Sequence, residues 1–531
     1  MKINSGMQIR YGAVISYVAI AISIASALLY TPWMKNSIGD ANYGLYTLVS
    51  SLISIFMMDF GLSTAVTRFV AKARAENDKK GINDILGYVF KLYIIISLCI
   101  AVVLVIVYFF IEKIYTGLNF EEIRTFKKVY LIFATYSIFS FPFTPLSGIL
   151  NANEKFIEIK LCDLFQKLFT IGLIIVALLL HYGITALILM NAVSGICTIF
   201  LKLLIIKSNN LVRPNFKVKD SFLLKQLLSF SIWVTVLALA QRMIFNLAPT
   251  LLGIFSNSIE IARFAPASQL EGYFFTFAFA INGLFLPTIA RYDYENRQEE
   301  FSKLMIKVGK YQIFILGLLF VGIFILSSEF MTLWMGESYK ISGYCTILLV
   351  FPSLLLYPQQ IANTLISVRN KVMYQAIAAL IVGVVNVILS IVLIPRYGVL
   401  GCSISICIAY FLNFILLNII YKKQLELKLS RFYKEVYLRF LPLIALCIIV
   451  LSVVFKFLNA NGWLGFALKV CVCCIVYVFI VLWFGFTKNE KMHIFLKIKT
   501  KINAIFRNSK SLEEKQLIKS VIKKISSIVR R

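Results

Sequence analysis

The stretch FTIGLIIVALLL at residues 169–180 is an uninterrupted apolar run within a segment that begins at residue 161. About 20 helical residues span the ~30 Å hydrocarbon core of a bilayer. A run of this length in lipid must be helical, because backbone groups there have no water to bond to. Transmembrane β-strands would instead be short and alternating. The run therefore predicts an all-α, polytopic membrane protein.

Segments of this kind recur along the 531 residues, of which 60% are hydrophobic and 15% are charged. No polar stretch is long enough to form a separate soluble domain. The first segment resembles a signal peptide, but with thirteen more behind it we expect an uncleaved helix. We predict fourteen transmembrane helices, over 10–30, 42–66, 86–111, 129–150, 161–180, 184–206, 227–250, 265–290, 311–334, 342–366, 372–394, 398–420, 440–458 and 463–486.

The loops between these segments alternate between rich and poor in Lys and Arg. With the N-terminus in the cytoplasm, cytoplasmic regions hold 43 of the 54 Lys and Arg residues, and outer loops hold 9. The positive-inside rule then predicts a multi-pass protein of the cell (inner) membrane with both termini cytoplasmic. The net charge of +29 is concentrated on the cytoplasmic side, which favours anionic lipids over nucleic acid as its partner.

The sequence repeats itself in part. LNANEKF at 150–156 precedes the fifth segment, and ISVRNKV at 366–372 precedes the eleventh, at an offset of 216 residues. HYGI at 181–184 and RYGV at 396–399 stand at the tips of the following hairpins, at an offset of 215. These matches predict two pseudo-symmetric six-helix halves in the same orientation. Paired halves place a substrate path at their interface.

The repeat suggests domain boundaries. We expect an N-terminal half over 1–207, a C-terminal half over 208–421, and two appended helices over 422–486. The remaining 487–531 has Ile and Val at helical spacing with Lys and Arg between them. This pattern predicts a basic amphipathic cytoplasmic tail lying on the inner leaflet.

Two charged residues lie inside the predicted spans of the second half. Arg242 is about 12 Å from the outer end of its span, and Glu271 about 9 Å, at 1.5 Å per residue. Gln241 and Asn246 flank the arginine. Buried charges in membranes face protein or a water-filled cavity. Two interpretations remain open: these residues line a substrate cavity in which Arg242 binds an anion, or they form a structural ion pair.

Motifs for catalysis or cofactor binding do not occur in the sequence. It has no Gly-rich phosphate loop and no nucleophile elbow, and its two histidines, His181 and His493, lie outside the spans. All ten cysteines fall in apolar segments, where they suit packing. We therefore expect no enzyme activity, no metal and no cofactor.

Several motifs resemble one family of transporters. They are IGDANYGLYTL at 38–48, DFGL at 59–62, TRFVA at 67–71, GILNANEK at 148–155 and FLPTIAR at 285–291. In order and spacing they resemble the Wzx-like O-antigen and capsule flippases of the multidrug/oligosaccharidyl-lipid/polysaccharide exporter superfamily. The resemblance covers nearly the whole chain, although relatives often have twelve spans.

This resemblance implies a function. Such proteins move undecaprenyl-diphosphate-linked oligosaccharides of O-antigen, capsule or exopolysaccharide from the inner to the outer leaflet, by alternating access driven by an ion gradient. The resemblance implies a cationic cavity, to which Arg68 and Arg291 are carried over by their motifs. It also implies a polysaccharide polymerase and a chain-length regulator as partners. We expect a monomer.

Two other functions compete with this one. A drug/cation antiporter of the same superfamily would require an acidic cavity, whereas Arg242 favours an anionic substrate. A polytopic polysaccharide-processing enzyme would need a large outer loop or a buried histidine, and the predicted outer loops are short. The flippase is therefore the preferred interpretation.

Overall fold

The computed structural model describes residues 5–209, 214–218, 221–282, 285–458, 460–488 and 490–492. Every regular element within these ranges is a helix. The predicted all-α fold is thereby confirmed. The predicted amphipathic tail lies outside the described residues from 493 onward.

The helices form two compact units, one comprising Met1–Phe301 with Ser327–Leu429, the other Ser302–Leu326 with Ser430–Arg531. This grouping differs from the predicted domain boundaries at 207, 421 and 486. Those boundaries follow the sequence repeat and stay a prediction. The first half of the repeat contains α1 (Ser5–Ile38), α2 (Asp40–Phe56), α3 (Leu62–Ala75), α4 (Lys79–Ile114), α5 (Phe120–Ser140), η1 (Phe141–Phe143), α6 (Pro145–Ala152), α7 (Phe156–Leu179) and α8 (Ile184–Ser208).

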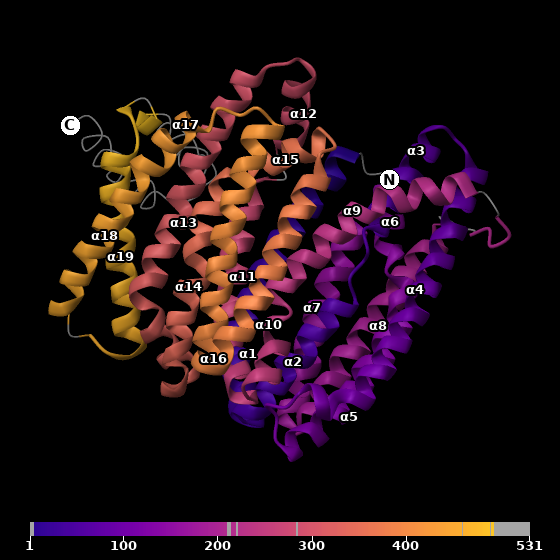
Figure 1. Ribbon diagram of the computed structural model, residues 1–531, viewed down its shortest axis with the longest axis horizontal. Helices are drawn as coiled ribbons and strands as arrows, with labels where there is room; N and C mark the ends of the chain where they lie inside the picture. Colours follow the sequence, from indigo (N-terminus) through magenta and orange to yellow (C-terminus); the bar gives the residue numbers. More distant parts are fainter. Residues whose placement is uncertain are drawn as a thin grey trace, which may run out of the picture. The chain divides into compact units, whose positions relative to one another are not determined.

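The second half follows the same course. It contains α9 (Ser221–Phe245), α10 (Ala248–Phe255), α11 (Ser258–Asn282), α12 (Leu286–Tyr294), α13 (Gln298–Met335), η3 (Glu337–Tyr339), α14 (Lys340–Leu356), η4 (Tyr357–Gln359), α15 (Ile361–Val368) and α16 (Val372–Gln424). The middle of α13 belongs to the second unit, together with α17 (Leu429–Phe432), η5 (Tyr433–Tyr437), α18 (Leu438–Phe457) and α19 (Gly462–Gly485). Within that unit, α18 and α19 lie side by side (Figure 1).

Ten helices of the described part are long and apolar enough to cross a membrane, or eleven if α9 and α10, bent by 45°, form one span. The predicted eleventh and twelfth segments count once because α16 contains both, interrupted at Gly398, where φ is 54°. The predicted segment 42–66 is divided between α2 and α3. Phe60 and Gly61, in the connection between them, have positive φ angles of 50° and 68°, so α2 and α3 do not form one continuous helix.

The two halves break at equivalent places. A short 3-10 turn containing Pro142 separates α5 from α6, and one containing Pro358 separates α14 from α15. Proline has no N–H and so interrupts the helical hydrogen bonding. Glu154 and Asn370, just before α7 and α16, share left-handed φ angles of 58° and 56°. Both pairs are 216 residues apart, the offset found between the sequence repeats.

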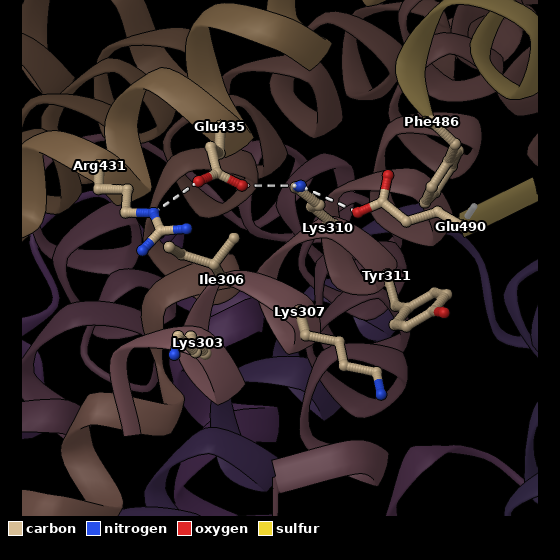
Figure 2. A pocket seen from close by; sticks show the side chains of 9 residues that line it. All are labelled: Lys303, Ile306, Lys307, Lys310, Tyr311, Arg431, Glu435, Phe486 and Glu490. Carbon is tan, nitrogen blue, oxygen red and sulfur yellow. Dashed lines mark hydrogen bonds and ion pairs between the residues drawn. The ribbon is translucent and has the colours of Figure 1, made fainter. Parts of the chain in front are cut away.

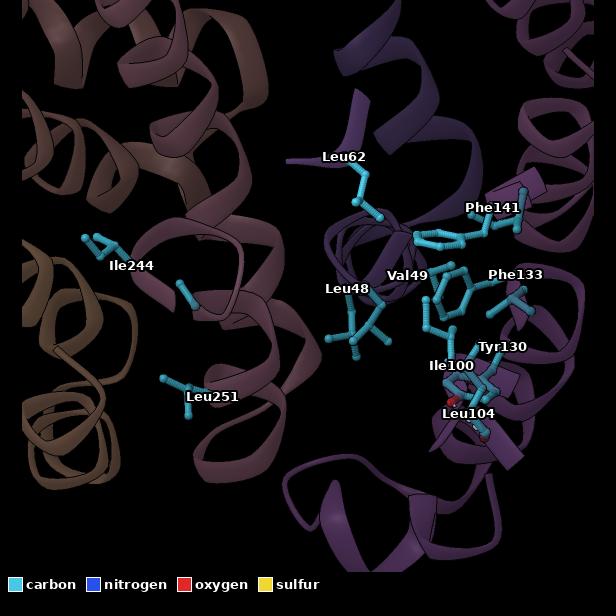
Figure 3. Close-up of a cluster of buried hydrophobic side chains, with 14 of the residues drawn as sticks. Leu48, Val49, Leu62, Ile100, Leu104, Tyr130, Phe133, Phe141, Ile244 and Leu251 are labelled. Carbon is cyan, nitrogen blue, oxygen red and sulfur yellow. Dashed lines mark hydrogen bonds between the residues drawn. The ribbon is translucent and has the colours of Figure 1, made fainter. Parts of the chain in front are cut away.

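A large hydrophobic core is built mainly from helices of the first half and also includes Ile244 of α9 and Leu251 of α10 (Figure 3). Leu48 and Val49 of α2 are fully buried, as are Phe133 of α5 and Phe141 of η1. The rings of Tyr130 and Phe133 meet edge to face, with centroids 5.5 Å apart, a favourable aromatic geometry. One face of α2 is therefore packed in the core, and the other face is left to line a cavity.

Candidate functional site

A polar cavity of about 340 Å³ lies between helices of the two halves, within the first unit. α1 and α2 contribute from the first half, and the bend between α9 and α10, together with α11, from the second. Among the residues that the structure describes, none in the cavity lining carries a formal charge. Its polar lining residues are Tyr30, Thr31, Tyr43, Tyr46, Thr47, Ser50, Ser51, Ser54, Asn246, Ser268 and Gln269.

The spacing of hydroxyl residues along α2 explains this polar face. Positions 43, 46, 47, 50, 51 and 54 recur at three- and four-residue intervals, which places them on one side of a helix. Thr47 donates to the Tyr43 carbonyl at 3.0 Å, and Asn191 Nδ2 donates to the Tyr46 hydroxyl at 3.0 Å. These bonds satisfy the polar groups inside an apolar bundle. This polar face was not among the predicted site residues, although its spacing is visible in the sequence at 43–54.

Arg242 lies beside the end of the cavity that Ser54 lines. Asp40 lies at the opposite end of α2. The Arg242 Nη1 donates to Ser54 Oγ at 2.8 Å. The arginine lies in the last turn of α9, and the N–H groups of Asn246 and Leu247 donate to its carbonyl at the bend. A cation is favoured at a helix C-terminus. A guanidinium is thus held where the two halves meet.

Glu271 has different surroundings. It is 5% exposed on α11 and accepts a hydrogen bond from the Tyr357 hydroxyl at 2.9 Å. It is not part of the cavity lining. Within the part of the chain that the structure describes, no ion pair within 4.0 Å joins Glu271 to Arg242. The two residues have separate partners, so the structural ion pair considered from the sequence is not formed.

The other predicted site residues lie at varied positions. Asn246 lines the cavity, whereas Gln241 is exposed on α9. Arg68 on α3 and Arg291 on α12 are exposed outside the cavity, and the Arg291 guanidinium lies 5.8 Å from the ring centre of Tyr292. The structure therefore brings only Asn246 into the lining, with Arg242 one turn before it. The roles of all six residues stay predictions.

Side chains join the two halves at the opposite end of the cavity, near Asp40. The Tyr339 hydroxyl of η3 donates to Asp40 Oδ1 at 2.8 Å. Lys35 Nζ, at the end of α1, donates to the Met335 carbonyl at 3.0 Å. The positive-inside pattern predicts that this end faces outward. These bonds join the two halves at this predicted outer end.

A glycine makes the close approach at this end possible. Gly44 of α2 lies against Ser258, the first residue of α11, and a Cβ atom at Gly44 would be 2.0 Å from the Ser258 carbonyl oxygen. Real Cβ atoms do not approach backbone oxygens so closely. The contact between α2 and α11 therefore depends on the missing side chain at residue 44.

Comparisons with known proteins agree with this architecture. Residues 10–293 match a family described as "Polysaccharide biosynthesis protein". The probable low-salt glycan biosynthesis flippase Agl15 of Haloferax volcanii is 22% identical over 209 residues, which cover 39% of this chain and 43% of the relative. The match thus spans less than half of that curated relative's length.

Solved structures share the fold across most of the chain. The inward closed conformation of the lipid II flippase MurJ has a TM-score of 0.69 at 17% identity, covering 89% of this chain and 98% of that one. The inward-facing conformation of a multidrug resistance MATE family transporter of the MOP superfamily has a TM-score of 0.63 at 14% identity, covering 80% and 99%. At such identities the similarity shows the fold.

Proposed function

Because this chain belongs to the polysaccharide biosynthesis protein family, we propose that it is a flippase for undecaprenyl-diphosphate-linked oligosaccharide. In this proposal it carries O-antigen, capsule or exopolysaccharide units from the inner to the outer leaflet. The observation that carries the proposal is the uncharged polar cavity between the two halves, with Arg242 beside its inner end. A lipid-linked sugar needs such a path only for its polar head, since its polyprenyl tail can stay in lipid.

The cavity suits this cargo chemically. Its hydroxyl and amide groups can exchange hydrogen bonds with sugar hydroxyls, and Tyr30, Tyr43 and Tyr46 offer aromatic surfaces. The volume of about 340 Å³ lies in the ordinary range for ligand sites. A guanidinium forms charge-assisted, sometimes bidentate bonds with phosphate. Arg242 is therefore our candidate for the diphosphate, with the sugars toward the tyrosines.

The two-half architecture supports alternating access. In transporters built from repeats, the halves rock against each other around a site at their interface. The Tyr339–Asp40 and Lys35–Met335 hydrogen bonds join the halves at the predicted outer end. In our proposal these bonds break when the outer side opens, and the Arg242–Ser54 bond is exchanged for bonds to the substrate.

We propose Glu271 as the group that links transport to an ion gradient. A buried carboxylate without a cation beside it is costly in a membrane. Glu271 is buried on α11 with the Tyr357 hydroxyl as its donor. Tyr357 begins η4, the break between α14 and α15. Proton uptake at Glu271 would therefore alter a hydrogen bond at a break in the second half.

The rival functions receive less support. A drug/cation antiporter would place acidic groups in its cavity, and the described lining residues include none. The relatives and structural neighbours are transporters, which favours transport over enzyme chemistry. We propose that the protein is a monomer of the inner membrane with both termini in the cytoplasm. Its proposed partners are anionic lipids, a polysaccharide polymerase and a chain-length regulator.

A deletion strain tests the function. With no redundant flippase present, deletion is expected to cause lipid-linked oligosaccharide to accumulate on the inner leaflet, and the wild-type gene is expected to restore surface glycan. A gene encoding Arg242→Ala, expressed to the same level, is expected to restore less surface glycan than the wild-type gene does. Undiminished surface glycan in the deletion strain would overturn the proposal.

A further inference from the structure

A second pocket, of about 340 Å³, lies wholly within the second unit (Figure 2). It forms where α13 meets η5 and the residues that follow α19. Four of its lining residues are cationic and two are acidic. The lining consists of Lys303, Ile306, Lys307, Lys310, Tyr311, Arg431, Glu435, Phe486 and Glu490.

The three lysines come from one face of α13. Residues 303, 307 and 310 are separated by four and three positions, which aligns their side chains along the helix. Lys303 and Lys307 are exposed, whereas Lys310 is 6% exposed. Only the innermost lysine is therefore part of the packed structure.

Lys310 is held between two carboxylates. Its Nζ lies 2.9 Å from Glu435 Oε2 and 3.0 Å from Glu490 Oε1. Arg431 Nε donates to the other oxygen of Glu435 at 2.8 Å, and the Thr487 N–H donates to the other oxygen of Glu490 at 2.8 Å. Both carboxylates thus have internal donors on each oxygen, and this group forms the frame of the pocket.

The pocket is richer in basic than in acidic side chains. Among the lining residues that the structure describes, four are cationic and two are acidic, and Lys303 and Lys307 are the exposed lysines of this set. Ile306, Tyr311 and Phe486 give it an apolar wall. We propose that this pocket binds the phosphate group of an anionic glycerophospholipid of the inner leaflet. This proposal stands independently of the transported substrate.

The surroundings point to a lipid as the carrier of the phosphate. α19 exposes large apolar side chains, with Phe484 59% and Phe479 62% exposed, as expected of a helix in contact with acyl chains. Lys491 Nζ lies 5.3 Å from the ring centre of Trp483 and donates to its carbonyl, an aromatic and basic pairing typical of the membrane–water interface. Basic pockets at the cytoplasmic ends of transmembrane helices bind anionic headgroups.

The test compares two double variants of the full-length protein. Lys303→Gln with Lys307→Gln removes the two exposed lysines of the pocket and leaves Lys310, Glu435 and Glu490 in place. Lys422→Gln with Lys423→Gln removes the same charge from an exposed pair at the end of α16, on the same predicted side. Binding of phosphatidylglycerol and of phosphatidylcholine is measured by native mass spectrometry in an uncharged detergent. Thermal melting with inorganic phosphate tests whether a free anion suffices.

We expect the pocket variant to bind phosphatidylglycerol about 30-fold more weakly than wild type, which corresponds to about 2 kcal/mol. The control variant is expected to change less than threefold, and Lys303→Arg with Lys307→Arg to retain binding. Equal losses in both Gln variants would mean diffuse surface attraction and would overturn the proposal. Equal binding of phosphatidylcholine would overturn it too, as would stabilisation by inorganic phosphate at the same concentrations.

Discussion

Arg242 of α9 and Ser54 of α2 are joined by a hydrogen bond of 2.8 Å, although 188 positions separate them in the chain. The bond connects the two halves next to the polar cavity, and Ser54 is part of the lining. A charged donor bonded to a hydroxyl can exchange it for a stronger anionic acceptor. This relationship makes Arg242 the most direct target for experiments.

Replacing Arg242 is expected to impair transport. A hydrogen bond to a charged group contributes about 2 kcal/mol, so Arg242→Ala is expected to slow flipping roughly 30-fold, measured with labelled lipid-linked oligosaccharide in proteoliposomes. Arg242→Lys is expected to be intermediate, because lysine keeps the charge but not the planar fork. Ser54→Ala is expected to stay within about threefold of wild type, since in our proposal the substrate replaces Ser54.

The control is Arg396→Ala, an exposed arginine of α16 outside the cavity. It is expected to transport as the wild type does. Normal transport by Arg242→Ala would remove this residue from the mechanism. A loss in Ser54→Ala as large as that in Arg242→Ala would assign the arginine to holding the two halves together.

Glu271→Gln is expected to uncouple transport from the proton gradient. The amide is nearly the same size and still accepts the bond from Tyr357, so folding is expected to persist. Flipping in proteoliposomes is measured with and without an imposed pH difference. We expect the wild type to respond to the gradient and the variant to show no response.

The control for this variant is Glu337→Gln, whose side chain is 75% exposed in η3. It is expected to keep the full response to the gradient. If Glu271→Gln responds as strongly as the wild type, the coupling group lies elsewhere.

Gly44→Ala is expected to weaken the contact between the two halves at the predicted outer end. The added Cβ would lie 2.0 Å from the Ser258 carbonyl oxygen, and backbone on both sides must move to relieve the clash. Overpacking of this kind costs about 1–3 kcal/mol. We expect a lower melting temperature in detergent. In a background without native cysteines, an impermeant maleimide is expected to label Ser50→Cys faster from outside.

Gly172→Ala is the matched control, because its Cβ would meet no atom within 4 Å. Its melting temperature is expected to equal that of the wild type or to rise slightly, since alanine favours helix over glycine. Equal effects of the two substitutions would show that the close approach at Gly44 does not matter.

Glu490→Gln is expected to destabilise the protein in a pH-dependent way. Burial raises the pKa of the Glu490 carboxyl, but hydrogen bonds from Thr487 and Lys310 outweigh it and hold the pKa below its ordinary value. A lowered folded-state pKa contributes stability above the unfolded-state pKa and loses it as pH falls through the folded value. The variant is therefore expected to melt lower than wild type at neutral pH.

The difference in melting temperature is expected to shrink as pH falls below the ordinary range of a glutamate. Glu76→Gln, in a surface pair with Lys72 in which Glu76 is 59% exposed, is expected to change little at any pH. A constant difference for Glu490→Gln across the whole pH range would contradict the role of its charge.

The fold class could be predicted from the sequence because the fold class of a membrane protein depends on local composition. The cost of placing a backbone and its side chains in lipid depends on composition over about 20 residues, so runs such as 169–180 identified the helices. The sequence repeat at an offset of 216 likewise predicted equivalent places, and Pro142 and Pro358 stand at that offset in the two breaks. Composition did not predict the helix breaks themselves. One break divides the segment 42–66 into α2 and α3, and another separates α9 from α10 at a bend.

The sequence by itself determined that this is a helical membrane protein with an internal repeat, and it identified Arg242 and Glu271 as unusual charges. Depth along a span placed them at similar levels, but depth does not fix the rotation of a helix about its axis. Only the packing of distant helices decided that Arg242 meets Ser54 and that Glu271 meets Tyr357. The same is true of Lys310, whose partners Glu435 and Glu490 lie 125 and 180 positions away. Hydropathy acts on each segment separately, whereas a site requires particular faces to meet.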